Sequence, residues 1–186
     1  VEPKTALENF IKTGKIPPVD DTLAKAHFES LLSKLKAQGF VNYEFSNFGK
    51  PGFFSQNNLG YWLGKPYLGI GPGAHSYGKG QRSWNLAHNI KYIRALLQDT
   101  RPFEYEELTS KDAYNEFVMT RLRTMWGIPL IEVQQRFGSL FSHYLLEQAS
   151  EHLAASRLIL RDEHLIIGST AKFLTDGIAA DLFWVD

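Results

Sequence analysis

A glycine-rich loop is the feature that most restricts how this chain can fold. Residues 67–77 read Tyr-Leu-Gly-Ile-Gly-Pro-Gly-Ala-His-Ser-Tyr, with glycine at positions 69, 71 and 73. Glycine tolerates positive φ and lets a backbone approach a neighbour or a ligand closely. An aromatic segment, Tyr61-Trp62, precedes the loop, and aromatic side chains suit a flat, mostly apolar ligand. The sequence therefore predicts either a ligand-binding loop or a tight turn here.

Composition excludes several kinds of chemistry. The 186 residues suffice for one compact domain or two small ones. Lys+Arg 20 balance Asp+Glu 20, so no surplus charge favours nucleic acid. The absence of cysteine excludes disulfides, thiolate nucleophiles and iron–sulfur ligation by this chain. No apolar run approaches the roughly 20 residues of a membrane span, and no signal peptide is visible. The chain begins at Val1 rather than Met, so we expect part of a longer or processed protein.

The first hundred residues alternate between helical and strand patterns, as in an α/β fold. Gly39 ends an amphipathic pattern that Asp20 or Asp21 begins. The expected elements are helices at 5–13, 20–38 and 89–98, a helical turn at 58–63, and strands at 40–45, 67–70 and up to 85, with a loop at 46–56. Residues 101–108 show no clear periodicity, and we place a domain boundary there, between 104 and 105.

The remaining residues predict a small, mostly helical unit. Thr109 is a suitable N-cap for a helix reaching about 125. Further helices are expected at 130–137, at 142–155 and from 169 to about 183. Two apolar runs, 157–161 and 164–168, flank Asp162-Glu163 as in a β-hairpin. Several helices with a hairpin indicate a winged-helix-like domain at 105–186. Its helix at 143–155 contains no Lys or Arg, which argues against nucleic acid as a partner.

Several strings, in order along nearly the whole chain, resemble the oxygen-independent coproporphyrinogen III oxidase family, a radical-SAM family. They include Val-Glu-Pro-Lys-Thr at 1–5, Tyr-Glu-Phe-Ser-Asn-Phe-Gly at 43–49, the segment 58–62, the glycine loop at 67–77 and Trp-Asn at 84–85. The similarity continues through 116–123 to 174–177. It is greatest to the branch regarded as heme chaperones.

The resemblance implies a partial TIM-like barrel, a [4Fe–4S] cluster on a three-cysteine loop and bound S-adenosylmethionine. Residues 1–104 would be the last barrel elements, and 105–186 the accessory winged-helix-like domain. Because this chain has no cysteine, the cluster loop must lie in a missing N-terminal barrel half. The fragment alone should therefore not cleave S-adenosylmethionine.

The heme-chaperone branch carries a His-Asn-x-x-Tyr-Trp motif associated with heme. The corresponding residues here are Asn57-Asn58-Leu59-Gly60-Tyr61-Trp62, so Asn57 replaces the histidine. An amide is a poor axial ligand for heme iron, whereas imidazole is a common one. Heme would then bind without that ligand or through another histidine, or this member has a different ligand.

Each candidate residue has a structural alternative. Gly69, Gly71 and Gly73 could offer N–H groups to a carboxylate or phosphate, or form a turn at a strand end. His75 could bind iron, donate to a propionate or orient a cofactor, or be an ordinary hydrogen-bonding residue. Tyr61 and Trp62 could stack on a porphyrin or anchor the loop. Asn47, and similarly Glu2, could face the pocket from a strand end or cap a turn. The candidate site residues are Asn47, Asn57, Asn58, Tyr61, Trp62, Gly69, Gly71, Gly73 and His75.

The resemblance implies a cytoplasmic protein of tetrapyrrole metabolism. It would either decarboxylate coproporphyrinogen III by radical chemistry or bind heme and deliver it to acceptor proteins. The alternative is a catalytically inert structural or protein-interaction fragment.

Overall fold

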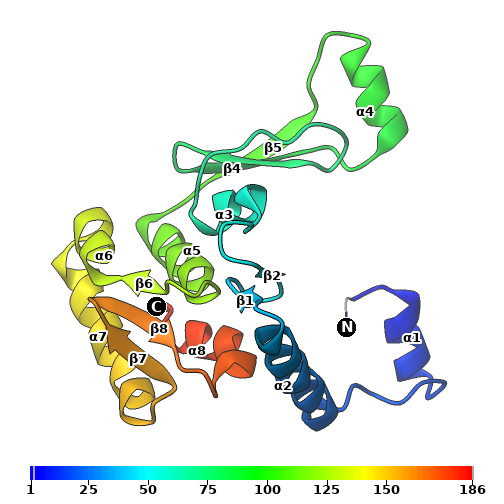
Figure 1. The fold of residues 1–186 in the computed structure, drawn as a ribbon. Coiled ribbons are helices and arrows are strands. Elements are labelled where there is room, and N and C mark those ends of the chain that lie inside the picture. The colour runs from blue at the N-terminus through cyan, green and yellow to red at the C-terminus, as the bar shows by residue number, and fades with distance from the viewer. Residues whose placement is uncertain (2, 186) are drawn as a thin grey trace. The chain divides into compact units, whose positions relative to one another are not determined.

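The computed structural model describes Val1 and residues 3–185, so Glu2 lies outside the described residues (Figure 1). Contacts divide the chain into two compact units, residues 1–40 and residues 41–186. The first unit contains α1 (Ala6–Lys12) and α2 (Asp21–Ala37). Thr5 and Asp20 cap these helices by accepting from the backbone N–H groups of Glu8 and Leu23. Both helices were predicted, and neither has a buried residue.

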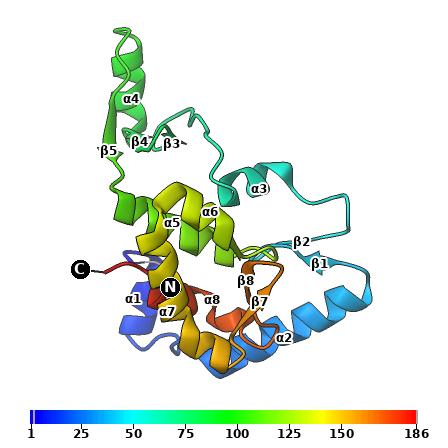
Figure 2. The ribbon, with the colours of Figure 1, turned by 90° about the vertical axis from the view of Figure 1, so that its left-hand side faces the viewer.

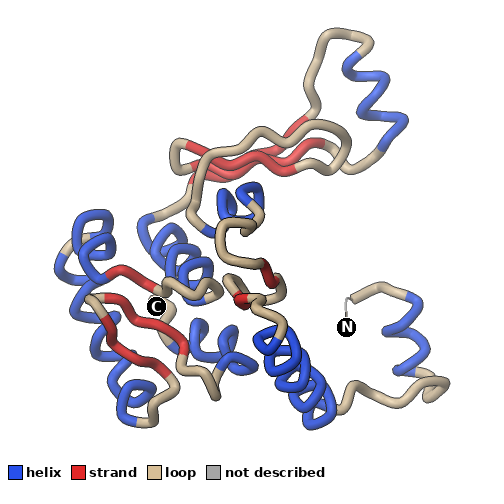
Figure 3. Tube along the Cα trace, viewed as in Figure 1, coloured by secondary structure: helices blue, strands red, loops and turns tan. Residues whose placement is uncertain are grey.

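The second unit begins with short antiparallel elements. Strand β1 (Val41–Asn42) pairs with β2 (Phe48–Gly49), and helix α3 (Gln56–Trp62) follows. A three-stranded antiparallel sheet then contains β3 (His75–Gly78), β4 (Gln81–Asn85) and β5 (Phe103–Glu107). Figure 3 shows helix α4 (Asn89–Leu96) as an excursion between β4 and β5.

The C-terminal residues form a winged-helix-like arrangement. Helix α5 (Ser110–Leu122) leads to β6 (Ile128–Pro129), then to α6 (Leu130–Phe137) and α7 (Ser139–Ala154). The hairpin β7 (Leu158–Arg161)–β8 (His164–Ile167) pairs with β6 in the order β6-β8-β7. A 3₁₀ turn, η1 (Lys172–Leu174), leads into α8 (Thr175–Asp181). Figures 1 and 2 show α5 and α6 side by side.

One apolar cluster stabilises this C-terminal arrangement. Tyr114 and Val118 on α5, Val133 on α6, Leu145 on α7 and Leu165 on β8 are fully buried in it. Helices and hairpin thereby bury their apolar faces against one another, which is the main source of their stability. The predicted cap at Thr109 is present as a capping box with Asp112.

Several expected elements are shorter or differently placed. The strand predicted at 40–45 is limited to β1, because the Asn42 amide donates to the carbonyls of Glu44 (2.7 Å) and Asn47 (3.3 Å) and turns the chain. The strand predicted at 67–70 is a single bridge between Tyr67 and Tyr77. The last helix does not begin at Ser169 or Thr170, since η1 precedes α8.

Two other predictions missed an element or its start. Residues 101–108 lack apolar periodicity but form β5, because β4 supplies a pairing edge and pairing depends on the backbone rather than on side-chain pattern. Helix α7 begins at Ser139 rather than at Ser142 or His143. The predicted domain boundary between 104 and 105 falls within β5 and stays a prediction. None of the helices in the described residues is long and apolar enough to cross a membrane.

Candidate functional site

Helix α3 carries four of the predicted site residues: Asn57, Asn58, Tyr61 and Trp62. The Ser55 hydroxyl accepts from the Asn58 backbone N–H at 3.3 Å and begins the helix. Tyr61 and Trp62 at its other end line a pocket, whereas Asn57 is exposed in the first turn. The structure thus brings the aromatic half of the motif into a cavity and leaves the Asn57 side chain in solvent.

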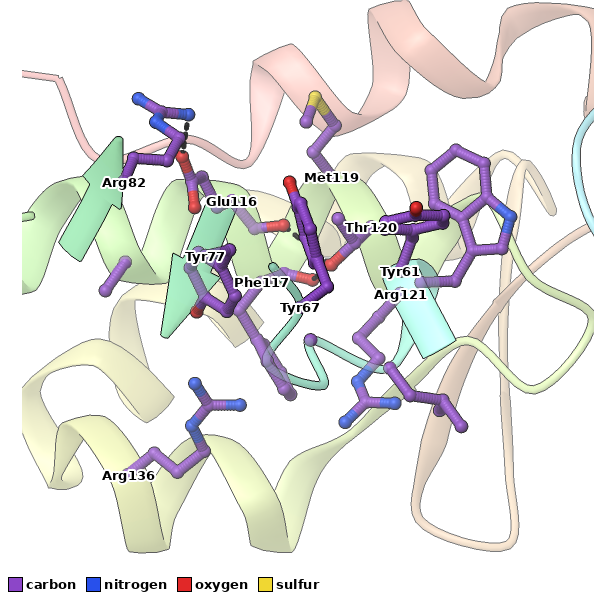
Figure 4. Close-up of a pocket in the computed structure, with 14 residues that line it drawn as sticks. Tyr61, Tyr67, Tyr77, Arg82, Glu116, Phe117, Met119, Thr120, Arg121 and Arg136 are labelled. Carbon is purple, nitrogen blue, oxygen red and sulfur yellow. Dashed lines mark hydrogen bonds and ion pairs between the residues drawn. The ribbon is translucent and has the colours of Figure 1, made fainter. Parts of the chain in front are cut away.

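This cavity, the Tyr–Arg pocket, has a volume of about 220 Å³ (Figure 4). It lies among α3, the β3–β4 hairpin, α5 and α6. In the view of Figure 4, Arg82 and Tyr61 lie at opposite ends, with Tyr67 between them. Its lining residues are Tyr61, Trp62, Leu63, Gly64, Tyr67, Tyr77, Arg82, Ala113, Glu116, Phe117, Met119, Thr120, Arg121 and Arg136.

Three tyrosines form one wall of the pocket. The Tyr61 and Tyr67 rings meet edge to face with centroids 4.7 Å apart, and Tyr67 stacks with Tyr77 at 6.2 Å. Burial, followed by the proximity of Tyr61, raises the pKa of Tyr67. The Tyr67 phenol therefore stays protonated near neutral pH and can donate a hydrogen bond to a ligand.

A charged cluster closes one end of the pocket. Arg82 on β4 donates to Glu106 on β5 through Nε (2.6 Å) and forms an ion pair with Glu116 on α5. Burial raises the pKa of the Glu116 carboxyl, although the Arg82 charge acts in the opposite direction. Burial lowers the pKa of Arg82, but Glu106 and Glu116 outweigh it and the net pKa is raised. Arg82 is a permanent cation, as arginines are, and the raised pKa means that Glu116 takes up a proton more readily than usual.

Two further arginines, Arg121 and Arg136, line the pocket and contact the ring of Phe117. The guanidinium carbons of Arg121 and Arg136 lie 5.0 Å and 4.9 Å from the Phe117 ring centroid. Both arginines also contact the carboxylate of Glu132, at 2.8 Å and 3.2 Å. Each guanidinium has five N–H donors, so one carboxylate leaves donor capacity unused. The pocket thus combines aromatic surface with cations that suit a carboxylate.

The glycine loop is held by a buried asparagine. The Asn85 amide donates to the carbonyl oxygens of Gly71 (2.9 Å) and Gly69 (3.4 Å), and its own oxygen accepts from Arg101 Nε at 2.9 Å. The N–H of Gly69 donates to the Ser76 hydroxyl at 3.0 Å, and that of Gly73 to the Leu86 carbonyl at 3.3 Å. These contacts use two of the N–H groups that an anion would need, and they favour a structural role for the loop. Its three glycines do not line the Tyr–Arg pocket.

His75 and Asn47 occupy separate positions. His75 begins β3, is exposed, and lies 6.1 Å from the Trp84 ring of the neighbouring strand. Asn47 donates to the buried carboxylate of Glu44, whose other oxygen accepts from the Ser46 N–H at 3.3 Å. Asn47 therefore satisfies a buried charge in a turn, which is the structural alternative. Neither residue lines the pocket.

The residues of this chain do not fit an iron–sulfur cluster. The sequence contains no cysteine, and the described residues contain no group of three or more His, Asp or Glu side chains able to hold a metal ion. Thiolates for such a cluster would have to come from outside this sequence.

Residues 108–168 match the HemN C-terminal domain family. The heme chaperone HemW of Mycobacterium tuberculosis is 32% identical over 183 residues, which cover 98% of this chain and 45% of that protein. The chain belongs to the HemN/HemW family. HemW of Bacillus subtilis is 30% identical over 179 residues, which cover 91% of this chain and 47% of that protein. The chain thus spans a little under half the length of these two relatives.

A solved structure shares the HemN/HemW fold of this chain. It is coproporphyrinogen III oxidase (HemN) of Escherichia coli, a radical SAM enzyme, with a TM-score of 0.65 and 15% identity over 84% of this chain and 40% of that one. The α/β class and the winged-helix-like C-terminal arrangement are therefore those of this family.

Sequence reasoning missed most of the pocket: Tyr67, Tyr77, Arg82, Glu116, Phe117, Met119, Arg121 and Arg136. A partial signal was present. Phe117 and Arg121 are four residues apart on a predicted helix and so share a face. Their convergence with Tyr77 and Arg82 depends on how the β3–β4 hairpin packs, which no local pattern encodes.

Proposed function

We propose that α3 and the Tyr–Arg pocket bind one edge of a tetrapyrrole, in a cytoplasmic heme chaperone of the radical-SAM family. The observation that carries this proposal is the position of Tyr61 and Trp62. The motif's aromatic pair lines a pocket that also holds Arg121 and Arg136. Two relatives of this chain, from M. tuberculosis and B. subtilis, are named heme chaperones, and this supports heme as the cargo.

The chemistry of the pocket matches both parts of a tetrapyrrole. A flat apolar macrocycle packs against aromatic rings, and carboxylate side chains pair with guanidinium groups. At about 220 Å³ the pocket is smaller than the roughly 300–1,000 Å³ of typical ligand sites. We infer that a carboxylate-bearing edge enters the pocket while the macrocycle lies over the exposed Tyr61.

Iron ligation requires a residue other than Asn57. His75 is exposed and begins the strand that carries Tyr77, so it is our candidate for the axial ligand. A histidine placed at position 57 would restore the family motif on an exposed turn of α3 without disturbing a buried contact.

Coproporphyrinogen III is the second candidate ligand, favoured by the shared fold with the E. coli oxidase. It carries the same type of carboxylate side chains and would use the same arginines. The radical chemistry would require cluster ligands that this sequence lacks, so binding rather than turnover is the property to test on this chain.

A hemin titration followed in the Soret region tests the proposal. We expect saturable, near-stoichiometric binding by the wild type. Loss of a group that only supports a metal ligand costs 10–100-fold in affinity, so His75→Ala should weaken binding by about tenfold or more. Asn57→His should strengthen it, and His143→Ala, an exposed α7 histidine, is the matched control. Absence of saturable binding by folded protein would refute heme binding. Equal affinity of His75→Ala and His143→Ala would refute ligation by His75.

A further inference from the structure

Arg123, just after α5, connects the aromatic motif to the C-terminal helix α8. Its guanidinium carbon lies 5.6 Å from the Trp62 ring centroid and 5.4 Å from that of Phe45. Both distances are within the range of cation–π attraction. Arg123 thus contacts the last residue of α3 and the segment that follows β1, which are 17 residues apart in the sequence (62 minus 45).

The orientation of the guanidinium is fixed from the opposite side. Nε and Nη2 of Arg123 each lie 2.9 Å from one of the two carboxylate oxygens of Asp176, in the first turn of α8. Such two-point pairing fixes the plane of the guanidinium as well as its position. Because the Asp176 side chain is 52% exposed, the pair adds little to stability. Its effect is directional: it holds the guanidinium where Trp62 contacts it.

We propose that Arg123 is a positioning residue that orients the Trp62 indole at the Tyr–Arg pocket and thereby sets the affinity for the tetrapyrrole edge. The functional part of this inference rests on the proposed function. Trp62 ends a seven-residue helix in which no residue is buried, and the Arg123 guanidinium contacts its ring. Through Asp176, α8 and the aromatic motif of α3 are coupled by one guanidinium.

A lysine at position 123 keeps the charge but loses the planar fork. It cannot form the two-point contact with Asp176 and stacks less well on rings. The test therefore uses Arg123→Lys and, as a second variant, Asp176→Asn, which keeps the shape of the partner but removes its charge. Lys111→Gln is the matched control, because Lys111 lies 6.0 Å from the ring of a different tryptophan, Trp184.

The measurement is ¹⁹F NMR of the full chain labelled with 5-fluorotryptophan, combined with hemin titration. A Trp62→Phe sample assigns the Trp62 resonance. Arg123→Lys should shift that resonance and leave those of Trp84 and Trp184 in place. The strength of an exposed cation–π contact corresponds to about 2- to 5-fold in affinity, and we expect hemin binding to weaken by that factor. Asp176→Asn should change the Trp62 resonance and the hemin affinity in the same direction as Arg123→Lys does. Lys111→Gln should shift only the Trp184 resonance.

The two readouts separate the possible failures. An unmoved Trp62 resonance in Arg123→Lys would overturn the positioning role, whatever the hemin result. A moved resonance with unchanged hemin affinity would show that the orientation of Trp62 does not set binding, and would also overturn the proposal. If the wild type binds no hemin, the proposed function fails, and the ¹⁹F spectra still decide whether Arg123 orients Trp62.

Discussion

Residues 41–107 and residues 108–185 are stabilised in different ways. The second region is built around an apolar cluster in which Val133 and Leu145 are completely buried. The first region has no such cluster among its described residues: it buries Tyr43 and Tyr92 beside the carboxylate of Glu44 and the amide of Asn85. Apolar burial is non-directional and tolerates repacking, whereas buried polar groups must keep their hydrogen-bond partners. The C-terminal region is therefore specified by pattern, and the turn at 42–47 and the glycine loop by individual contacts.

The largest expected difference concerns leucine-to-alanine substitutions. Leu145→Ala removes a fully buried side chain and should reduce the free energy of unfolding by about 2–5 kcal/mol. Leu68→Ala, at a side chain that is 70% exposed, should change it by no more than about 0.5 kcal/mol. Urea unfolding followed by circular dichroism measures both. Equal losses would show that the apolar cluster does not distinguish the two regions.

Two glycines sharpen the comparison within the first region. A Cβ at Gly69 would lie 2.1 Å from the His75 carbonyl oxygen, so Gly69→Ala should cost about 1–3 kcal/mol through overpacking. A Cβ at Gly60, inside α3, meets nothing within 4 Å, and Gly60→Ala should stabilise the protein by about 0.5–1 kcal/mol. Thermal unfolding of the two variants tests whether one substitution destabilises the protein and the other stabilises it. A stable Gly69→Ala protein would mean that the loop does not pack against β3 as described.

The same distinction explains what could be read from the sequence. The cap at Thr109, the helix start at Asp20 or Asp21 and the hairpin at 158–167 were predicted correctly, because propensity and apolar pattern agree there. The strands at 40–45 and 67–70 were over-extended, because side-chain amides turn the chain there: Asn42 donates to the carbonyls of Glu44 and Asn47, and Asn85 holds the glycine loop. Strand β5 was missed because its own sequence has no strand pattern, and the strand forms by pairing with β4.

The candidate site, too, was predicted only where a local sequence motif specifies it. The motif placed Tyr61 and Trp62 on one short helix, and the structure brings both to a pocket. That Arg121, Arg136 and Tyr67 join them could not be predicted, because these side chains come from α5, α6 and the segment before β3, which meet only after folding. Their functional roles, like those of His75 and Asn57, stay predictions.

The smallest expected effect is electrostatic and lies where the two regions meet, at Glu116 of α5 facing Arg82 of β4. Burial raises the pKa of Glu116 above 4.5, and the nearby carboxylates Glu106 and Asp112 add to the rise. The folded state therefore binds this proton more tightly than the unfolded state does. Its contribution to stability is fully present below pH 4.5 and is lost as the pH rises through the raised pKa.

A ¹³C NMR titration of the Glu116 side-chain carboxyl measures this directly. The midpoint should lie above 4.5 in the wild type and move further up in Arg82→Gln, because the one attractive charge is removed while burial stays the same. Glu116→Gln should abolish this part of the pH dependence of the unfolding free energy. A midpoint below 4.5 would mean that the ion pair with Arg82 dominates over burial. The contact between the two regions would then be stabilised by charge near neutral pH, and Arg82→Gln would move the midpoint from below 4.5 to above it, because burial remains.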